Sequence, residues 1–162
     1  APEREKGKRI LMIGDSMWMG TATVSKPIRL SGKDTFMGTS FTNDDIMNFD
    51  KADDYDPRIV SSEAGIWTLD LIGRKKNLPY PRMVITVGDN RLPLTIRMYA
   101  LSGMETKRIE FSDVKTFGGK PRPSLMTIID SMTSGNRTMV RFESIKSGKI
   151  DRTRLSPSGF MK

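Results

Sequence analysis

Residues 83–100 read MVITVGDNRLPLTIRMYA, and this stretch decides the fold class. Apolar and polar residues alternate on both sides of Gly88-Asp89-Asn90-Arg91, which has the composition of a tight connection. Alternation at every second residue is typical of a strand with one buried face, and two such strands around a short turn form a hairpin. Pro93 is expected at the start or edge of its strand, because proline cannot donate to a ladder.

The same alternation extends along the chain in both directions, interrupted by Gly, Ser, Asn and Asp turn signals. From Met83 onward it predicts a four-strand meander with one apolar and one polar face. The expected strands are Arg9–Ile13, Met17–Met19, Pro27–Leu30, Arg58–Ala64, Ile66–Ile72, Met83–Val87, Leu92–Ala100, Thr106–Val114, Ser124–Asp130 and Arg137–Ile145.

One helix is expected, from Asp44 to Phe49. Thr42 or Asn43 can cap it, and Asp44 and Asp45 fall in its first turn, where the helix dipole favours negative charge. Residues 36–41 (FMGTSF) are expected to form a loop that touches the core.

Composition excludes several classes of function. The chain has 162 residues, a length that fits one domain, and it contains no Cys and no His. Disulfides, Ser–His–Asp and Cys–His catalysis and the common zinc sites are therefore ruled out within this sequence. The stretch Asp44–Asp56 holds six aspartates, but it lacks the regular spacing of a calcium loop and predicts a solvated acidic segment. We expect no metal, no cofactor and no catalytic residue.

The net charge of +8 suits anionic partners, although a basic protein without such partners is an equal alternative. The basic residues are scattered and do not form a nucleic-acid-binding motif, so no nucleic acid is expected. No apolar run approaches the length of a membrane span. The chain begins at Ala1-Pro2-Glu3 without a methionine, which is typical either of a processed product or of a segment cut from a longer protein.

Several motifs, taken in order, resemble the LolA-like outer-membrane lipoprotein-sorting proteins. They are Gly14-Asp15-Ser16-Met17-Trp18-Met19, the basic stretch Lys26–Leu30, residues 36–41 with Asp44-Asp45-Ile46 after them, the strand Ile109–Val114 with Gly118-Gly119, and Thr138–Phe142. Gly20 and Thr21 stand where that family usually has an aromatic residue and the lead into a proline.

The resemblance implies a mainly β fold: a curled antiparallel sheet that forms an incomplete, unclosed barrel with one or few short helices. Residues 1–162 are expected to be a single domain of this kind that lacks the N-terminal helix and first strands of the family. The implied function is a periplasmic carrier, sometimes anchored as a lipoprotein, that holds lipid or lipoprotein acyl chains in a concave apolar groove.

Apolar residues on the expected strands and loops are the candidates for this groove, and an excess of methionine, 12 residues, suits an adaptable apolar surface. The candidates are Met17, Met19, Phe36, Met37, Phe41, Trp67, Leu69, Leu71, Met83, Ile85, Ile96, Met98, Ile109, Phe111, Met126, Ile128, Val140 and Phe142. A basic surface that could meet lipid phosphates or an acidic transporter comprises Lys26, Arg29, Lys33, Lys75 and Lys76.

Two other classes of function remain open. One is a lipid esterase or phospholipase in the same groove, with a serine assisted by Lys or Asp in place of histidine. The other is an interaction module that docks on an envelope transporter and carries nothing. Self-association through an exposed sheet edge is also expected.

Overall fold

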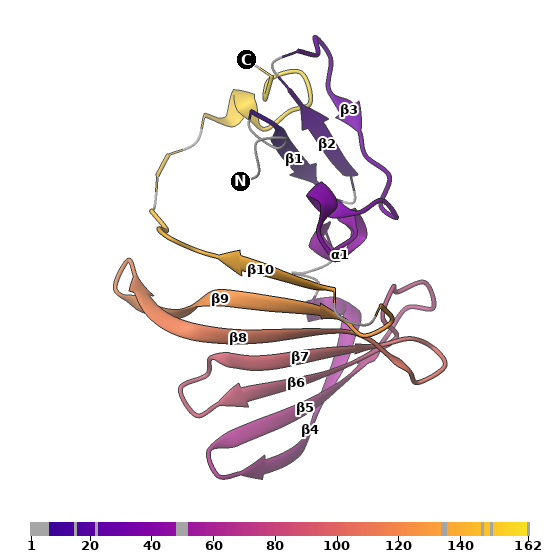
Figure 1. Ribbon diagram of the computed structural model, residues 1–162, viewed down its shortest axis with the longest axis vertical. Helices are drawn as coiled ribbons and strands as arrows, with labels where there is room; N and C mark the ends of the chain where they lie inside the picture. The colour runs from indigo at the N-terminus through magenta and orange to yellow at the C-terminus, as the bar shows by residue number, and fades with distance from the viewer. Residues whose placement is uncertain are drawn as a thin grey trace. The chain divides into compact units, whose positions relative to one another are not determined.

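The computed structural model describes residues 7–14, 16–21, 23–47, 52–133, 136–146, 148–149 and 151–161, drawn in colour in Figure 1. The chain divides into two compact units. One unit contains residues 1–50 and 148–162, and the other contains residues 51–147. The expectation of a single domain that lacks N-terminal elements stays a prediction.

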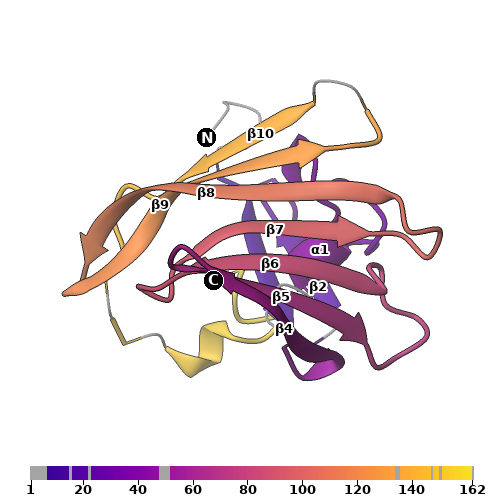
Figure 2. The same ribbon diagram turned by 90° about the horizontal axis from the view of Figure 1, so that it is seen from below.

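The larger unit is a seven-stranded antiparallel sheet in which each strand pairs with its neighbours in sequence, in the order β10-β9-β8-β7-β6-β5-β4 (Figures 1 and 2). Its two edge strands do not pair with each other, so the sheet is unclosed. The strands are β4 (Tyr55–Glu63), β5 (Ile66–Gly73), β6 (Arg82–Gly88), β7 (Pro93–Tyr99), β8 (Glu105–Phe117), β9 (Lys120–Asp130) and β10 (Arg137–Arg141).

Short turns that need positive φ fix the register of two hairpins. Ala64 and Gly65, with φ of 49° and 76°, join β4 to β5. Gly118 and Gly119, with φ of 56° and 78°, join β8 to β9. Two consecutive residues with positive φ give the turn whose twist matches that of paired strands, and glycine adopts this conformation at no steric cost.

The two edges of the sheet differ. The backbone N–H of Arg74 donates to the Asp54 carbonyl (2.8 Å), so Asp54 faces β5. In an antiparallel pair, residues alternate between facing the partner strand and facing away from it. The backbone groups of Tyr55, Pro57 and Ile59 therefore face away from β5. Pro57 therefore removes a donor that would have faced outward, and a bulge interrupts β4 between Ile59 and Ser61. At the other edge, β10 has five residues, and the backbone groups of Arg137, Met139 and Arg141 face away from β9.

The smaller unit contains the sheet β1-β2-β3, with β1 (Arg9–Ile13), β2 (Ser16–Gly20) and β3 (Ile28–Arg29). The C-terminal segment belongs to this unit. The Arg9 guanidinium donates to the carbonyl oxygens of Phe160 (3.1 Å) and Met161 (3.2 Å). A Cβ at Gly20 would lie 2.2 Å from the Met161 sulfur, so the small residue at this position makes room for the segment.

Helix α1 (Asn43–Met47) begins with a capping box. The Thr42 hydroxyl accepts from the Asp45 backbone N–H (3.2 Å), and the Asp45 carboxylate accepts from the Thr42 backbone N–H (2.7 Å). Thr42 is thus the N-cap. The expected end at Phe49 lies outside the described residues.

The mainly β, unclosed antiparallel fold is confirmed, with ten strands in the described part of the chain. From Met83 onward the meander has five strands, β6 to β10, instead of the expected four, and β4 and β5 precede them in the same sheet. β8 and β9 are longer than expected, because pairing along the hairpin carries them past Val114 and before Ser124 to the glycine turn. β10 ends at Arg141 instead of Ile145. Residues 36–41 contain a 3₁₀ turn, Phe36–Gly38.

Three apolar residues, Met98, Ile109 and Ile128, are buried in the middle of the large sheet, and the last two have no exposed surface. We expect Ile109→Ala to lower the free energy of unfolding by about 2–5 kcal/mol, because it leaves a cavity. Ile109→Val should cost about 0.5–1.5 kcal/mol. Met139→Ala, at a position 73% exposed, should change stability by less than about 0.5 kcal/mol. Chemical unfolding measures all three, and equal effects of Ile109→Ala and Met139→Ala would contradict this packing.

Candidate ligand-binding face

Cross-strand register places the apolar residues of the large sheet on one face. Leu69 lies opposite Ile85, Ile85 opposite Ile96, Ile96 opposite Ile109, and Ile109 opposite Ile128. Directly opposite residues point to the same side of a sheet. This row of five aliphatic side chains crosses the sheet from β5 to β9.

Thirteen of the eighteen sequence candidates share this face, which we call the apolar face. By register they are Trp67, Leu69, Leu71, Met83, Ile85, Ile96, Met98, Ile109, Phe111, Met126, Ile128, Val140 and Phe142. Ile59 of β4, opposite Leu69, extends it to the edge strand.

Burial varies across the apolar face. Ile109 and Ile128 are fully buried, whereas Ile59 is 62% exposed, Trp67 40% and Phe142 38%. The indole N–H of Trp67 donates to Asp89 (3.0 Å), which fixes the orientation of this ring. The apolar face therefore has a packed centre, and large apolar side chains with free surface lie toward the β4–β5 side and beyond the end of β10.

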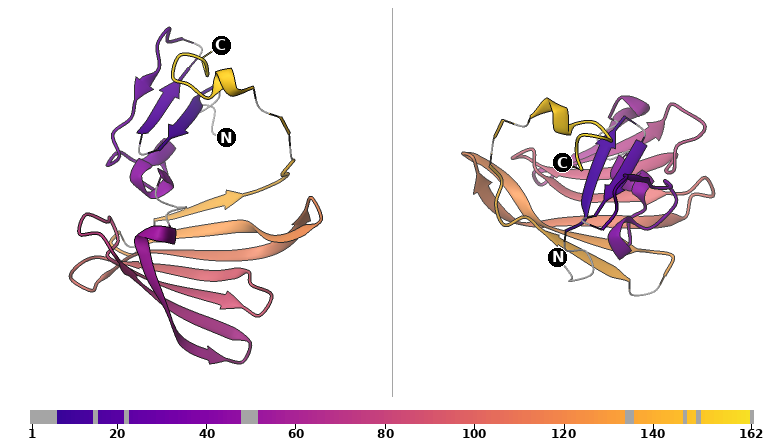
Figure 3. Two further views of the ribbon diagram at one scale, coloured as in Figure 1. Left: turned by 180° about the vertical axis from the view of Figure 1, so that it is seen from behind. Right: turned by 90° about the horizontal axis from the view of Figure 1, so that it is seen from above.

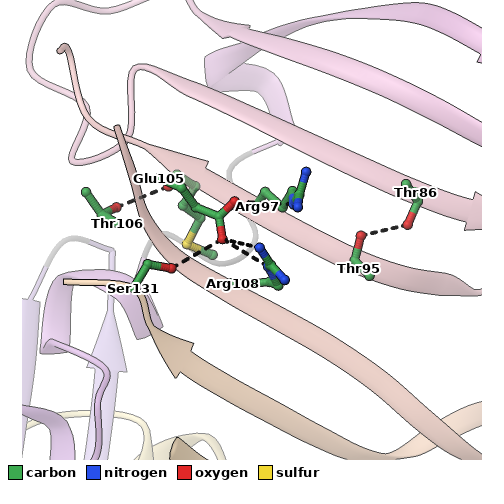
Figure 4. Close-up of polar contacts among 8 residues, drawn as sticks. Thr86, Thr95, Arg97, Glu105, Thr106, Arg108 and Ser131 are labelled. Carbon is green, nitrogen blue, oxygen red and sulfur yellow. Dashed lines mark hydrogen bonds and ion pairs between the residues drawn. The ribbon is translucent and has the colours of Figure 1, made fainter. Parts of the chain in front are cut away.

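The opposite face is polar and self-paired. Glu105 accepts from Arg108 (2.9 Å) and from Ser131 (3.2 Å) and lies 3.3 Å from the guanidinium of Arg97, as Figure 4 shows. Arg97 and Arg108 are directly opposite on neighbouring strands, an arrangement that destabilises a sheet unless a carboxylate intervenes. Glu105 supplies that carboxylate. Farther along, the hydroxyls of Thr86 and Thr95 are hydrogen-bonded (2.7 Å).

Sequence reasoning missed a polar cluster at one end of the apolar face. The same oxygen of Asp113 accepts from Ser124 (2.9 Å) and from Arg141 (2.7 Å) and lies 3.3 Å from the Lys115 ammonium. These contacts, with the Ser124 hydrogen bond as the largest cause, lower the pKa of Asp113. In the sequence, Asp113 follows Ile109 and Phe111 at the next alternate position. A carboxylate in this otherwise apolar series was the sequence signal that could have indicated the cluster.

The Ser124–Asp113 pair does not have the properties of a catalytic dyad. Ser124 has no exposed surface, so a substrate cannot reach its hydroxyl in this conformation. A general base works best with a pKa near the operating pH, whereas the pKa of Asp113 is lowered. This pair fits a structural role, holding the strands together where the sheet narrows to a hairpin.

The remaining apolar candidates lie in the smaller unit. Met17 has no exposed surface and Phe41 is 2% exposed, so both are core residues there. Met19, Phe36 and Met37 line a cavity of about 260 Å³ together with Ile10, Leu30 and the α1 residue Asn43. Trp18 is opposite Leu11 in the register and points to the other side of β2 from Met17 and Met19.

The expected basic surface divides between the two units. Lys26, Arg29 and Lys33 are exposed in the smaller unit, and Lys75 and Lys76 are exposed in the larger one. Arg29 donates to the Ser16 hydroxyl (2.9 Å), and Lys75 forms an ion pair with Asp54. Within the described part of the chain, no three carboxylates lie close enough to hold a metal ion. None of the described helices has the length and apolar character needed to cross a membrane.

Comparison with known proteins agrees with this geometry. A family model described as an uncharacterized protein matches residues 1–160. A crystal structure of a LolA superfamily protein from Nitrosomonas europaea is 26% identical, with a TM-score of 0.76, and the alignment covers 96% of this chain and 73% of that one. The chain belongs to this uncharacterized, LolA-like family. The resemblance expected from the sequence is confirmed.

Two further structures share the LolA-like fold. A domain assigned to outer membrane lipoprotein-sorting proteins, from Vibrio parahaemolyticus, is 20% identical with a TM-score of 0.68, and 86% of this chain matches 64% of it. A DUF1329 family protein from Desulfovibrio piger is 19% identical with a TM-score of 0.74, and 98% of this chain matches 72% of it. No curated protein matches the sequence.

We predict that Asp113→Asn makes the free energy of unfolding less sensitive to a fall in pH. A lowered pKa in the folded state means that Asp113 stabilises the protein above its ordinary pKa of 3.8, and this contribution is lost as the pH falls through the lower folded-state value. The stability deficit of Asp113→Asn should therefore be largest at neutral pH and shrink in acid. Urea unfolding at several pH values measures it.

Glu110→Gln is the matched control for this prediction, since it removes an exposed carboxylate from the same strand. A deficit of Asp113→Asn that is equal at pH 7 and pH 3, or that grows in acid, would contradict the assigned contacts.

Proposed function

We propose that the LolA-like chain is a carrier that holds acyl chains of lipids or lipoproteins against the apolar face. The observation that supports this proposal is the alignment of thirteen apolar candidates, three of them methionines, on one side of six neighbouring strands. The side chains of this face that keep free surface, such as Ile59, Trp67 and Phe142, offer contact to hydrocarbon beside the packed centre. The similarity to LolA superfamily and lipoprotein-sorting structures supports the same ligand class.

The mechanism is reversible burial of hydrocarbon. Each CH₂ group moved from water into an apolar environment contributes about 0.8 kcal/mol, so an acyl chain binds without covalent chemistry and without a cofactor. The flexible side chains of Met83 and Met126, which are partly exposed, adapt to chains of different shape. Release then requires only a second apolar site of higher affinity. The periplasm is the proposed location, with an envelope transporter as the proposed partner.

Native mass spectrometry of the purified chain, followed by organic extraction and lipid analysis, tests the proposal. A discrete adduct with the mass of a fatty acid or phospholipid would support it. An apo mass that stays unchanged after incubation with lipid would overturn it and would favour an interaction module. Hydrolysis of an added ester substrate would favour the esterase alternative, provided that a single Ser→Ala substitution abolishes it.

We predict that the exposed apolar side chains of the apolar face strengthen binding. The double variant Ile59→Gln/Phe142→Gln should bind dodecanoic acid about 10-fold more weakly, because roughly 1.4 kcal/mol of apolar burial is removed. The matched control is Ile72→Gln/Met139→Gln, which changes two exposed apolar residues of the polar face and should leave affinity unchanged. Isothermal titration calorimetry compares the two. An equal loss in both variants would contradict the assignment of the binding face.

We predict weak, salt-dependent self-association through the β10 edge. Two copies paired antiparallel about Met139 would place Arg137 of one copy opposite Arg141 of the other. Like charges directly opposite destabilise such pairing, and salt screens them. Sedimentation velocity should therefore show a dimer fraction that rises with protein concentration and with salt. A strictly monomeric species at every salt concentration would contradict this prediction.

A further inference from the structure

The β8–β9 hairpin reaches beyond the rest of the sheet. Toward the hairpin, pairing of β8 with β7 stops at Glu110, and pairing of β9 with β10 stops at Leu125. The pairs from Val114–Pro123 to Phe117–Lys120 therefore form a two-stranded ribbon. Figures 2 and 3 both show the tip of this hairpin extending past the ends of β6 and β7.

The side chains along the rows of the apolar face change from apolar to polar and charged at the base of this ribbon. Along β9, residues 128, 126, 124, 122 and 120 occupy alternate positions, and the register pairs them with positions on β8. The pairs are Ile109–Ile128 and Phe111–Met126, then Lys115–Arg122 and Phe117–Lys120, with Asp113 and Ser124 in hydrogen-bond contact between them. Counted at every second residue from Ile109 and Ile128, and across Asp113 with its positive φ of 55°, the rows that are apolar in the sheet carry Lys115, Arg122 and Lys120, together with Phe117, on the ribbon.

The positive charge of the ribbon exceeds the negative charge available to it. Residues 113–124 of the hairpin carry three cations, Lys115, Lys120 and Arg122, and one carboxylate, Asp113, and Arg141 of β10 adds a fourth cation in contact with Asp113. Lys115 and Arg141 already contact Asp113. Lys120 and Arg122 are exposed, and neither forms an ion pair with a residue in the described part of the chain.

The other end of the same rows is balanced. There Lys107 lies opposite Asp130, one cation against one carboxylate. The Lys107 ammonium also lies 5.9 Å from the centre of the Tyr80 ring. An anion that approaches the apolar face therefore meets uncompensated positive charge at the hairpin end, and it meets no such excess at the Lys107–Asp130 pair.

We propose that the hairpin cations Lys115, Lys120 and Arg122 bind the anionic head of an amphiphile whose acyl chain lies on the apolar face. The ligand class is then a single-chain or multi-chain lipid with a carboxylate or phosphate head, oriented with its head at the hairpin. Charge complementarity and the continuity of the rows through Met126, Ser124 and Arg122 support this orientation. The inference rests on the proposed carrier function, because it requires an acyl chain on the apolar face.

The test compares dodecanol, dodecanoate and dodecyl phosphate, which share one chain length and differ in the head. Calorimetry at pH 8, below the aggregation concentration of each ligand, gives the three affinities. The protein should bind both anionic ligands more tightly than dodecanol. Lys120→Gln/Arg122→Gln should weaken the anionic ligands roughly 3- to 30-fold and leave dodecanol unchanged. Added salt should reduce the preference of the unmodified protein.

The matched control is Arg58→Gln/Arg137→Gln, which removes two exposed cations from positions on the polar face. It should keep the preference for anionic ligands. Equal binding of all three ligands, or a preference that survives in the hairpin variant, would overturn the head-group site and leave the carrier function intact. Absence of binding by all three would overturn the carrier function itself. Binding of inorganic phosphate alone with the affinity of dodecyl phosphate would show an anion site unconnected to acyl chains and would also overturn the inference.

Discussion

Cross-strand register is the constraint on which the rest of the structure depends. Side chains alternate with a period of two, so a slip of one residue between neighbouring strands would move a strand's apolar residues to the opposite face. The row from Leu69 through Ile96 to Ile128 exists because the register of each strand pair from β5 to β9 places these side chains directly opposite one another. Two bulges, next to Thr86 and Met98, are absorbed at strand ends without disturbing this central row.

The two faces of the sheet stabilise it by different means. On the apolar face, buried aliphatic side chains such as Ile109 and Ile128 provide hydrophobic free energy. On the polar face, Glu105 neutralises two arginines, and Asp70 pairs with Arg82, whose guanidinium also lies 5.1 Å from the centre of the Tyr99 ring. The polar face is thus satisfied by its own side chains, whereas the apolar face combines a packed centre with exposed apolar side chains such as Ile59 and Trp67.

Much of this arrangement could be predicted from the sequence. Alternation around Gly88-Asp89-Asn90-Arg91 gave the hairpin, its face and the strand start at Pro93, because these depend on local patterns. The extent of β8 and β9 could not be predicted, since residues such as Lys120 and Pro121 are poor strand formers that pair only because the opposite strand is present. The Asp113 cluster was missed for a similar reason. It joins residues 113, 124 and 141, which are brought together only by the register of three strands. The lipid-binding role of the candidate residues stays a prediction.

Contact between an acyl chain and the apolar face is the central claim, and Trp67 reports on it directly. The chain has two tryptophans, so Trp18→Phe leaves Trp67 as the single indole, which is 40% exposed on the apolar face. Bromine atoms on an acyl chain quench indole fluorescence on contact. The account predicts that a brominated fatty acid quenches Trp67 in a saturable way and that the unbrominated acid competes for the same site. Saturable binding of the brominated acid with unchanged Trp67 emission would contradict it.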